Sequence, residues 1–486
     1  MSLRFLTPLY VETGLKAWIA SPYNTKVLCL QRYVRFFAYG GSALILALYL
    51  SSLNVSDQKI GLFMTLTLLG DVLISLVLTA VADGIGRRRM LAVGALLMTA
   101  SGVTFALSSE YWILVLASVL GVISPSGNEI GPFKAIEEST ISHLTPSAER
   151  SNVLAWYIIA GLGGAASGTI TFGWVVQQLQ VKYSWSPLES YRIVFWAYAA
   201  FGLVKFVLAL MLGSECELAP ETSTRPDTHS EISVSETSAL LPQGEDSTPK
   251  VAVQGQPVKS WSPKTLLPGL SKETRGVILK LCFLFGLDSL ASGLAPVSWM
   301  SYFLHHKFDL SEGRLGSLFF ACNILSSSSN LFAPSLARRL GLVKTMVFTH
   351  VPASLALAAI PLPNDAGLAM MFVLFRASVN SMDQAPRQAF LAAAVQPSER
   401  TAVMGLVNVV KTLCQSAGPV VTGIFANRHM FGLAFIVAGA LKIVYDILML
   451  AMFLGYRTVE ERAEENIEAE IETEREEGTD DFQSAA

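Results

Sequence analysis

Residues 82–89 read ADGIGRRR and join two long apolar runs. A related stretch recurs about 255 residues later, where residues 337–344 read ARRLGLVK. In both stretches an alanine precedes a glycine by four positions, and a basic residue follows that glycine by three. An acid-x-small-Pro pattern then follows each copy at nearly the same distance, EIGP at 129–132 and DQAP at 383–386. The chain therefore repeats a helix-loop-helix unit at half its length, which predicts two similar halves.

The composition places most of the chain in a membrane. Hydrophobic residues make up 52% of its 486 residues and charged residues only 15%, whereas soluble proteins average about 25% charged residues. Apolar stretches of about 20 residues, long enough to span hydrocarbon as helices, recur along the sequence. We predict about twelve such spans: 33–53, 60–82, 90–108, 111–133, 151–173, 191–213, 276–303, 313–336, 343–362, 367–391, 401–424 and 431–455.

The basic residues predict the orientation of these spans. Lys and Arg gather in the loops on one side, which includes 87–89 and 338–339, and are sparser on the other. Because cytosolic loops are enriched in these residues, we expect both termini and the long central loop to lie in the cytosol. Residues 1–31 lack the pattern of a cleavable signal, so the first span is expected to direct insertion. The five scattered cysteines are expected to be packing residues, with no metal site or cofactor.

The segment between the halves is expected to be a disordered cytosolic linker, because it is rich in Ser, Thr, Pro and acids. Within it, Glu236, Leu240 and Leu241 have the spacing of an acidic dileucine sorting signal, which would bind a sorting adaptor. Residues 457–486 form an acidic tail to which we assign no chemistry. The sequence therefore predicts either the plasma membrane or a vacuolar or endosomal membrane.

The run at 78–89 resembles the cytosolic loop signature of the major facilitator superfamily, G-x-x-x-D-R-x-G-R-R. Asp83, Gly86, Arg87 and Arg88 match that signature, whereas Thr79 and Gly84 depart from it. Because the chain has twelve predicted spans and repeats the loop pattern in its second half, the resemblance covers nearly the whole chain. It implies that Asp83, Gly86, Arg87 and Arg88 form a gating loop. The chain is loosely similar to fungal-type transporters and to proton antiporters of drugs and organic solutes, although their fourth- and fifth-span patterns match poorly.

Charged residues inside the predicted spans are candidates for a substrate or proton path, since each costs about 2.5–3.5 kcal/mol near mid-membrane. Asp71, Glu129, Asp288 and Asp383 are candidate proton carriers, because burial raises the pKa of an acid and lets it cycle protons. Arg376 would serve as a fixed countercharge or bind an anionic substrate. The alternative interpretation of each of these charged residues is a structural salt bridge between helices.

Local spacing adds three expectations about these charges. Arg376, Asn380, Asp383 and Arg387 are spaced by four, three and four, which places them on one face of a single helix. Lys442 and Asp446 are one turn apart and are expected to pair with each other, and Lys205 to snorkel. Finally, Gly and Pro residues at 286–296 predict that the seventh span bends beside Asp288.

The fold class predicted is an all-α membrane protein with twelve transmembrane helices in two pseudo-symmetric six-helix bundles. The expected organisation is a cytosolic N-terminal segment 1–32, a bundle 33–213, a linker 214–272, a second bundle 273–456 and a tail 457–486. The predicted function is secondary active transport of a small organic solute by alternating access, proton-coupled and in the export direction.

Two other functions agree less well with the sequence. A transporter-like nutrient sensor, which binds without translocating, is the alternative, although sensors rely on longer cytosolic extensions. An enzyme is not expected, because no catalytic cluster or nucleotide-binding loop is evident. The expected partners are the solute, protons and the lipid bilayer, with no nucleic acid, and the protein is expected to be a monomer.

Overall fold

The computed structural model describes residues 15–121, 123, 125, 132–146, 149–217, 272–330, 332–395 and 399–454. Within these ranges, the side chains of 75–84, 132, 272–274, 334, 385, 392 and 400–402 lie outside the description. The described residues form helices and no strand. Of the predicted site residues, Glu129, Glu236, Leu240 and Leu241 lie outside the described ranges, and so does the side chain of Asp83.

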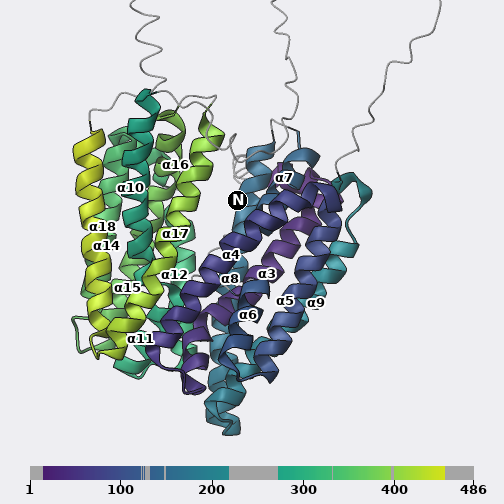
Figure 1. Ribbon diagram of the computed structural model, residues 1–486, viewed down its shortest axis with the longest axis vertical. Helices are drawn as coiled ribbons and strands as arrows, with labels where there is room; N and C mark the ends of the chain where they lie inside the picture. The colour runs from purple at the N-terminus through teal and green to yellow at the C-terminus, as the bar shows by residue number, and fades with distance from the viewer. Residues whose placement is uncertain are drawn as a thin grey trace, which may run out of the picture.

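The helices form two bundles that stand side by side (Figure 1). The first bundle contains α2 (Leu15–Ala20), α3 (Tyr23–Ser52), α4 (Asp57–Ile85), α5 (Arg87–Leu107), α6 (Tyr111–Gly121), α7 (Pro132–Leu144), α8 (Arg150–Tyr183) and α9 (Pro187–Leu210), followed by a short 3-10 helix, η2 (Ser214–Cys216). The second contains α10 (Lys272–Leu294), α11 (Val297–Phe308), α12 (Glu312–Asn330), α13 (Ala333–Leu340), α14 (Leu342–Ala359), α15 (Ala366–Asn380), η4 (Ser381–Asp383), α16 (Gln384–Ala393), α17 (Arg400–Asn427) and α18 (Phe431–Phe453).

These helices correspond to the twelve predicted spans, six in each bundle. Among the described residues, eight segments are individually long and apolar enough to cross a membrane. Four spans consist of two helices each, namely α6 with α7, α10 with α11, α12 with α13, and α15 with α16. The predicted bend in the seventh span is confirmed, because α10 ends at Leu294 and Pro296 is the N-cap of α11. The helix of the first span, α3, begins at Tyr23, ten residues before the predicted span.

The repeat in the sequence is also a repeat in the backbone. Gly86 separates α4 from α5 with φ 98° and ψ 139°, and Gly341 separates α13 from α14 with φ 86° and ψ 159°. A positive φ of this size strongly favours glycine, which explains why both copies of the pattern place a glycine here. We call the end of the molecule that carries these two loops the loop end, and the opposite end the far end.

Contacts between the two bundles concentrate at the far end, along two helix pairs. In the α4–α17 pair, a Cβ added to Gly61 would lie 2.4 Å from the carbonyl oxygen of Pro419. In the α8–α12 pair, a Cβ on Gly173 would lie 2.5 Å from that of Glu312. Their counterparts Gly423 and Gly316 are equally close to α4 and α8. We call these contacts the glycine seams. Toward the loop end the two bundles diverge (Figure 1).

Candidate functional site

A buried cluster of charges lies inside the second bundle, and we call it the C-terminal cluster. At its centre is the carboxylate of Asp288 on α10, only 4% exposed. Lys442 on α18 donates to its Oδ1 at 2.6 Å, and Arg387 on α16 donates to its Oδ2 at 2.7 Å. Arg387 also donates to Asp383, which ends η4 one turn earlier. Both oxygens of Asp288 are therefore held by cations from two other spans.

His350 on α14 links this centre to a third acid. Its Nδ1 lies 3.0 Å from both carboxylate oxygens of Asp446. Its Nε2 lies 3.4 Å from Nζ of Lys442 and 3.6 Å from Oδ1 of Asp288. Since an ammonium can only donate, its contact with Nε2 fits a neutral ring that carries its proton on Nδ1 and donates it to Asp446. With a second proton on Nε2, the ring could no longer accept from Lys442 and could only donate. Oδ1 of Asp288 is then the nearby acceptor.

The first bundle holds a different cluster, which we call the N-terminal cluster. Glu137 on α7 accepts a two-pronged pair of bonds from Arg35 on α3, at 2.7 and 2.8 Å. The hydroxyl of Tyr157 on α8 donates to Glu137 Oε2 at 2.7 Å, and Lys205 Nζ on α9 lies 3.8 Å from Oε1. Glu137 is 0% exposed. Among the residues that the structure describes, Glu137 is thus enclosed by two cations from other spans, and such partners offset the cost of burying a carboxylate.

The structure brings some of the predicted path residues together and separates others. Asp288 and Asp383 share the C-terminal cluster through Arg387. Arg376 lies on α15, before η4 interrupts the helix, and makes no ion pair with a described residue. Asp71 is buried on α4, in the other bundle. The continuous charged face expected from 376 to 387 is therefore split by η4, and only its last two charges meet.

Two expectations about partners are wrong. Lys442 and Asp446 do not pair with each other, because Lys442 bonds to Asp288 and Ser292 while Asp446 bonds to His350. Lys205 does not snorkel, since it is 1% exposed and points to Glu137. In both cases the lysine pairs with an acid on another helix, because a buried charge left without a partner is strongly destabilising.

Sequence reasoning missed Arg35, Glu137 and His350, and it found Lys205 without its partner. Arg35 and Lys205 lie within predicted spans, and Glu137 lies four residues beyond the predicted end of the fourth span, whose last helix runs on to Leu144. His350 is near the middle of the apolar run 343–362. An ionisable residue inside a span is itself a signal of function, so Arg35 and His350 could have been found.

The loop at Gly86 is held by a residue that the resemblance does not include. The carboxylate of Glu217, just after η2, accepts from the backbone N–H groups of Arg87 at 2.7 Å and Arg88 at 3.2 Å. These are free donors of the first turn of α5, where the helix dipole favours an anion. The side chain of Arg87 donates to Ser139 on α7. Every one of these contacts stays within the first bundle.

Comparison with known sequences places the chain in one family. The sequence profile of the Major Facilitator Superfamily matches residues 28–382 and 281–479. A membrane protein of Saccharomyces cerevisiae, YJR124C, described as uncharacterized, is 36% identical over 437 residues, which cover 89% of this chain and 94% of the yeast protein. The quinolone resistance protein NorA of Staphylococcus aureus is 22% identical over 186 residues, covering 38% of this chain and 44% of NorA.

Solved structures share the fold at low sequence identity. The nucleoside transporter NupG superimposes with a TM-score of 0.64 at 14% identity, covering 90% of this chain and all of NupG. The xylose transporter XylE from E. coli superimposes with a TM-score of 0.63 at 12% identity, covering 90% and 99% of the two chains. The resemblance noted from the loop signature is confirmed: the chain belongs to the Major Facilitator Superfamily, a family of secondary transporters, and has its all-α fold of two six-helix bundles.

Proposed function

We propose that this transporter couples the movement of a small organic solute to protons, and that the C-terminal cluster is the proton site. The observation that carries the proposal is the position of His350 between two carboxylates and an ammonium. Histidine is the side chain whose charge changes most readily near neutral pH. Here, a change of its charge alters the partners of Asp288.

Proton uptake would act on the cluster in the following order. A proton arriving on Nε2 of His350 cannot coexist with the bond donated by Lys442, so that bond breaks. The new N–H donates to Asp288 Oδ1, now 3.6 Å away. Asp288 then has one cation more than before, and the attraction that holds Lys442 or Arg387 weakens. Proton release restores the original partners.

The broken seventh span gives this change a route to the interface between the bundles. Asp288 is on α10, and the break at Pro296 leads directly into α11. On α11, Ser298 donates to the carbonyl oxygen of Ala43 at 2.7 Å, and Tyr302 donates to Asp57 at 2.8 Å. A rearrangement around Asp288 would thus be transmitted to α11, the helix that contacts the first bundle, as alternating access requires.

Orientation and direction complete the proposal. We assign the loop end to the cytosol, because the basic residues of the short loops gather there. With the far end closed, the state described here faces the cytosol. The linker 214–272 and its Glu236, Leu240 and Leu241 would then be accessible to a sorting adaptor. The likeness to NorA, a quinolone resistance protein, supports export as the direction.

Flux measurements in vesicles of purified protein test the proposal. Candidate organic compounds are supplied with an imposed pH difference, and both solute accumulation and internal pH are followed. We expect solute movement to carry protons, and Asp288→Asn to abolish pH-driven flux while the protein still inserts and elutes as a single species. Asp288→Glu should retain part of the flux. The exposed Asp365, whose carboxylate caps α15, provides the control Asp365→Asn, which should behave as wild type.

Three results would contradict the proposal. Solute binding without accumulation would identify a sensor. Accumulation without any proton movement would remove the coupling, and unchanged flux in Asp288→Asn would remove this residue from the proton site.

A further inference from the structure

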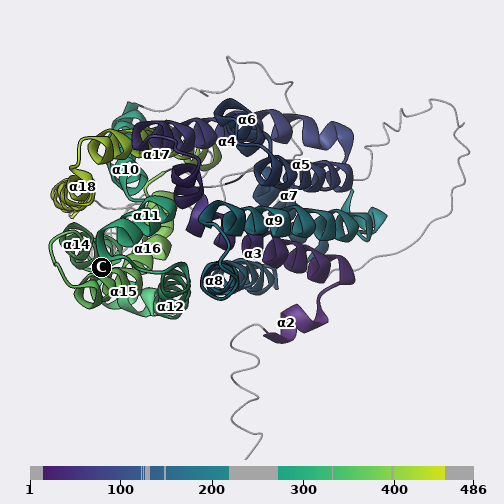
Figure 2. The same cartoon turned by 90° about the horizontal axis from the view of Figure 1, so that it is seen from below.

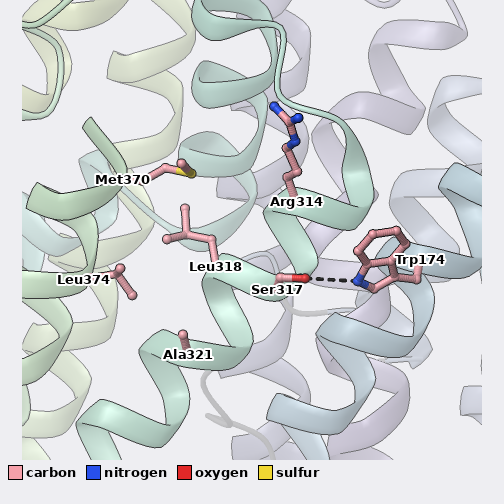
Figure 3. A pocket seen from close by; sticks show the side chains of 7 residues that line it. All are labelled: Trp174, Arg314, Ser317, Leu318, Ala321, Met370 and Leu374. Atoms are coloured by element: carbon pink, nitrogen blue, oxygen red, sulfur yellow. Dashed lines mark hydrogen bonds between the residues drawn. The ribbon is translucent and has the colours of Figure 1, made fainter. Parts of the chain in front are cut away.

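A hollow of about 310 Å³ lies where the two bundles meet on one side of the molecule, apart from both charged clusters. Its walls come from α8 of the first bundle and from α12 and α15 of the second (Figure 3). Seen from below, these three helices lie together along one edge of the molecule (Figure 2). Because they are spans of a membrane protein, this edge faces lipid.

The lining of the hollow is apolar along its length and charged at one end. Leu318, Ala321, Met370 and Leu374 form the apolar part. Arg314 stands at the end nearest the start of α12 (Figure 3). From Arg314 to Ala321 the helix rises about 10 Å. The charge is therefore near the membrane surface, and the apolar wall extends inward from it.

The position of Arg314 favours the binding of an anion. It is exposed, and it makes no ion pair with any residue that the structure describes. It lies in the first turn of α12, where the helix dipole disfavours a cation. A phosphate group can accept two parallel bonds from a guanidinium, and it would offset that unfavourable position.

Trp174 closes the hollow from the other bundle. Its Nε1 donates to Ser317 Oγ at 3.0 Å, across the α8–α12 seam, which fixes the indole as a wall (Figure 3). Tryptophan is enriched at the level of lipid headgroups, where one side of the ring is apolar and the N–H is wet.

We propose that this hollow binds one anionic glycerophospholipid, with its phosphate on Arg314 and an acyl chain along the apolar wall. The guanidinium of Arg314 favours a headgroup with a net negative charge. Like a lipid in the bilayer, the hollow is charged near the membrane surface and apolar further inward. The lipid would touch both bundles at the far end. It would therefore stabilise the state in which this end is closed, since a ligand favours the conformation it binds better.

Binding can be measured without any transport assay, so this proposal and the proposed function fail independently. Delipidated protein in detergent is titrated with phosphatidylglycerol or phosphatidylcholine, and bound lipid is counted by native mass spectrometry. We expect one tightly bound phosphatidylglycerol per protein, weaker binding of phosphatidylcholine, and at least five-fold lower occupancy in both Arg314→Gln and Ala321→Trp. Arg428→Gln, which removes another exposed base at the far end, should retain wild-type occupancy.

Two variants with different chemistry keep the test decisive if one fails to fold. Wild-type occupancy in both folded variants, or equal binding of the two lipids, would overturn the proposal. So would loss of binding in Arg428→Gln to the same extent.

Discussion

Both bundles bury charged residues inside their spans, but the numbers of acids and cations in the two clusters differ. In the first bundle one acid, Glu137, is enclosed by Arg35 and Lys205. In the second, three acids share two cations and a histidine. Among the described residues that contact Glu137 there is no histidine, whereas the C-terminal cluster contains His350. This difference is the basis of our proposal that the N-terminal cluster holds helices together and the C-terminal cluster exchanges protons.

The largest effect is expected from removing the acid of the N-terminal cluster. Glu137→Gln leaves Arg35 and Lys205 buried without their common partner, which should cost about 3–5 kcal/mol. We expect little folded protein, measured as the monodisperse fraction after detergent extraction and as the midpoint of thermal unfolding. The neighbouring Glu138 is 34% exposed and lies 3.9 Å from Lys134. Glu138→Gln should cost well under about 1 kcal/mol. Equal stability of the two variants would mean that the N-terminal cluster does not hold the bundle together.

The second prediction concerns the histidine that distinguishes the C-terminal cluster. His350→Gln retains one donor and one acceptor but cannot take up a proton, so the protein should fold while coupling is lost. We expect pH-driven flux to fall by about 5- to 150-fold, the range of typical coupling free energies. Solute exchange at equal pH should persist. His143→Gln, at an exposed histidine in the last turn of α7, is the control. A full pH dependence of flux in His350→Gln would assign proton coupling to another group.

A third, smaller effect is expected at the loop end. Glu217→Gln removes the negative charge from the N-terminus of α5, which should cost about 1 kcal/mol. The expected readout is faster hydrogen exchange at the amides of Arg87 and Arg88. Glu215, which instead accepts from the side chain of Asn24, provides the matched variant Glu215→Gln. Unchanged exchange in Glu217→Gln would show that the first turn of α5 is held by other contacts.

The fold could be read from the sequence because it depends on patterns that act over short distances. Apolar runs of membrane-spanning length, Pro296 in the seventh span and the glycine of each repeat all correspond to features of the structure. Their physical causes are local: hydrocarbon thickness, a missing N–H and a positive φ. The boundaries were less predictable, because helices such as α3 and α7 extend beyond the apolar runs.

The charged clusters were only partly predictable, because pairing depends on which helices face each other. Asp288 was found as a charge inside a span, but its partners Lys442 and His350 come from spans far away in sequence. The local pairing expected of Lys442 with Asp446 was wrong for this reason. The role of Glu217 was equally hidden, since nothing in the sequence links it to Gly86.

The glycine seams have a consequence for how the molecule changes state. Each seam brings backbone against backbone with a glycine on both sides, so neither pair can slide part of the way without losing its close fit. The far end should consequently open along both lines at once, in an all-or-none manner, and partly open forms should be rare. A methyl group at Gly61 or Gly316 would keep the two helices of its seam apart and so prevent the far end from closing fully.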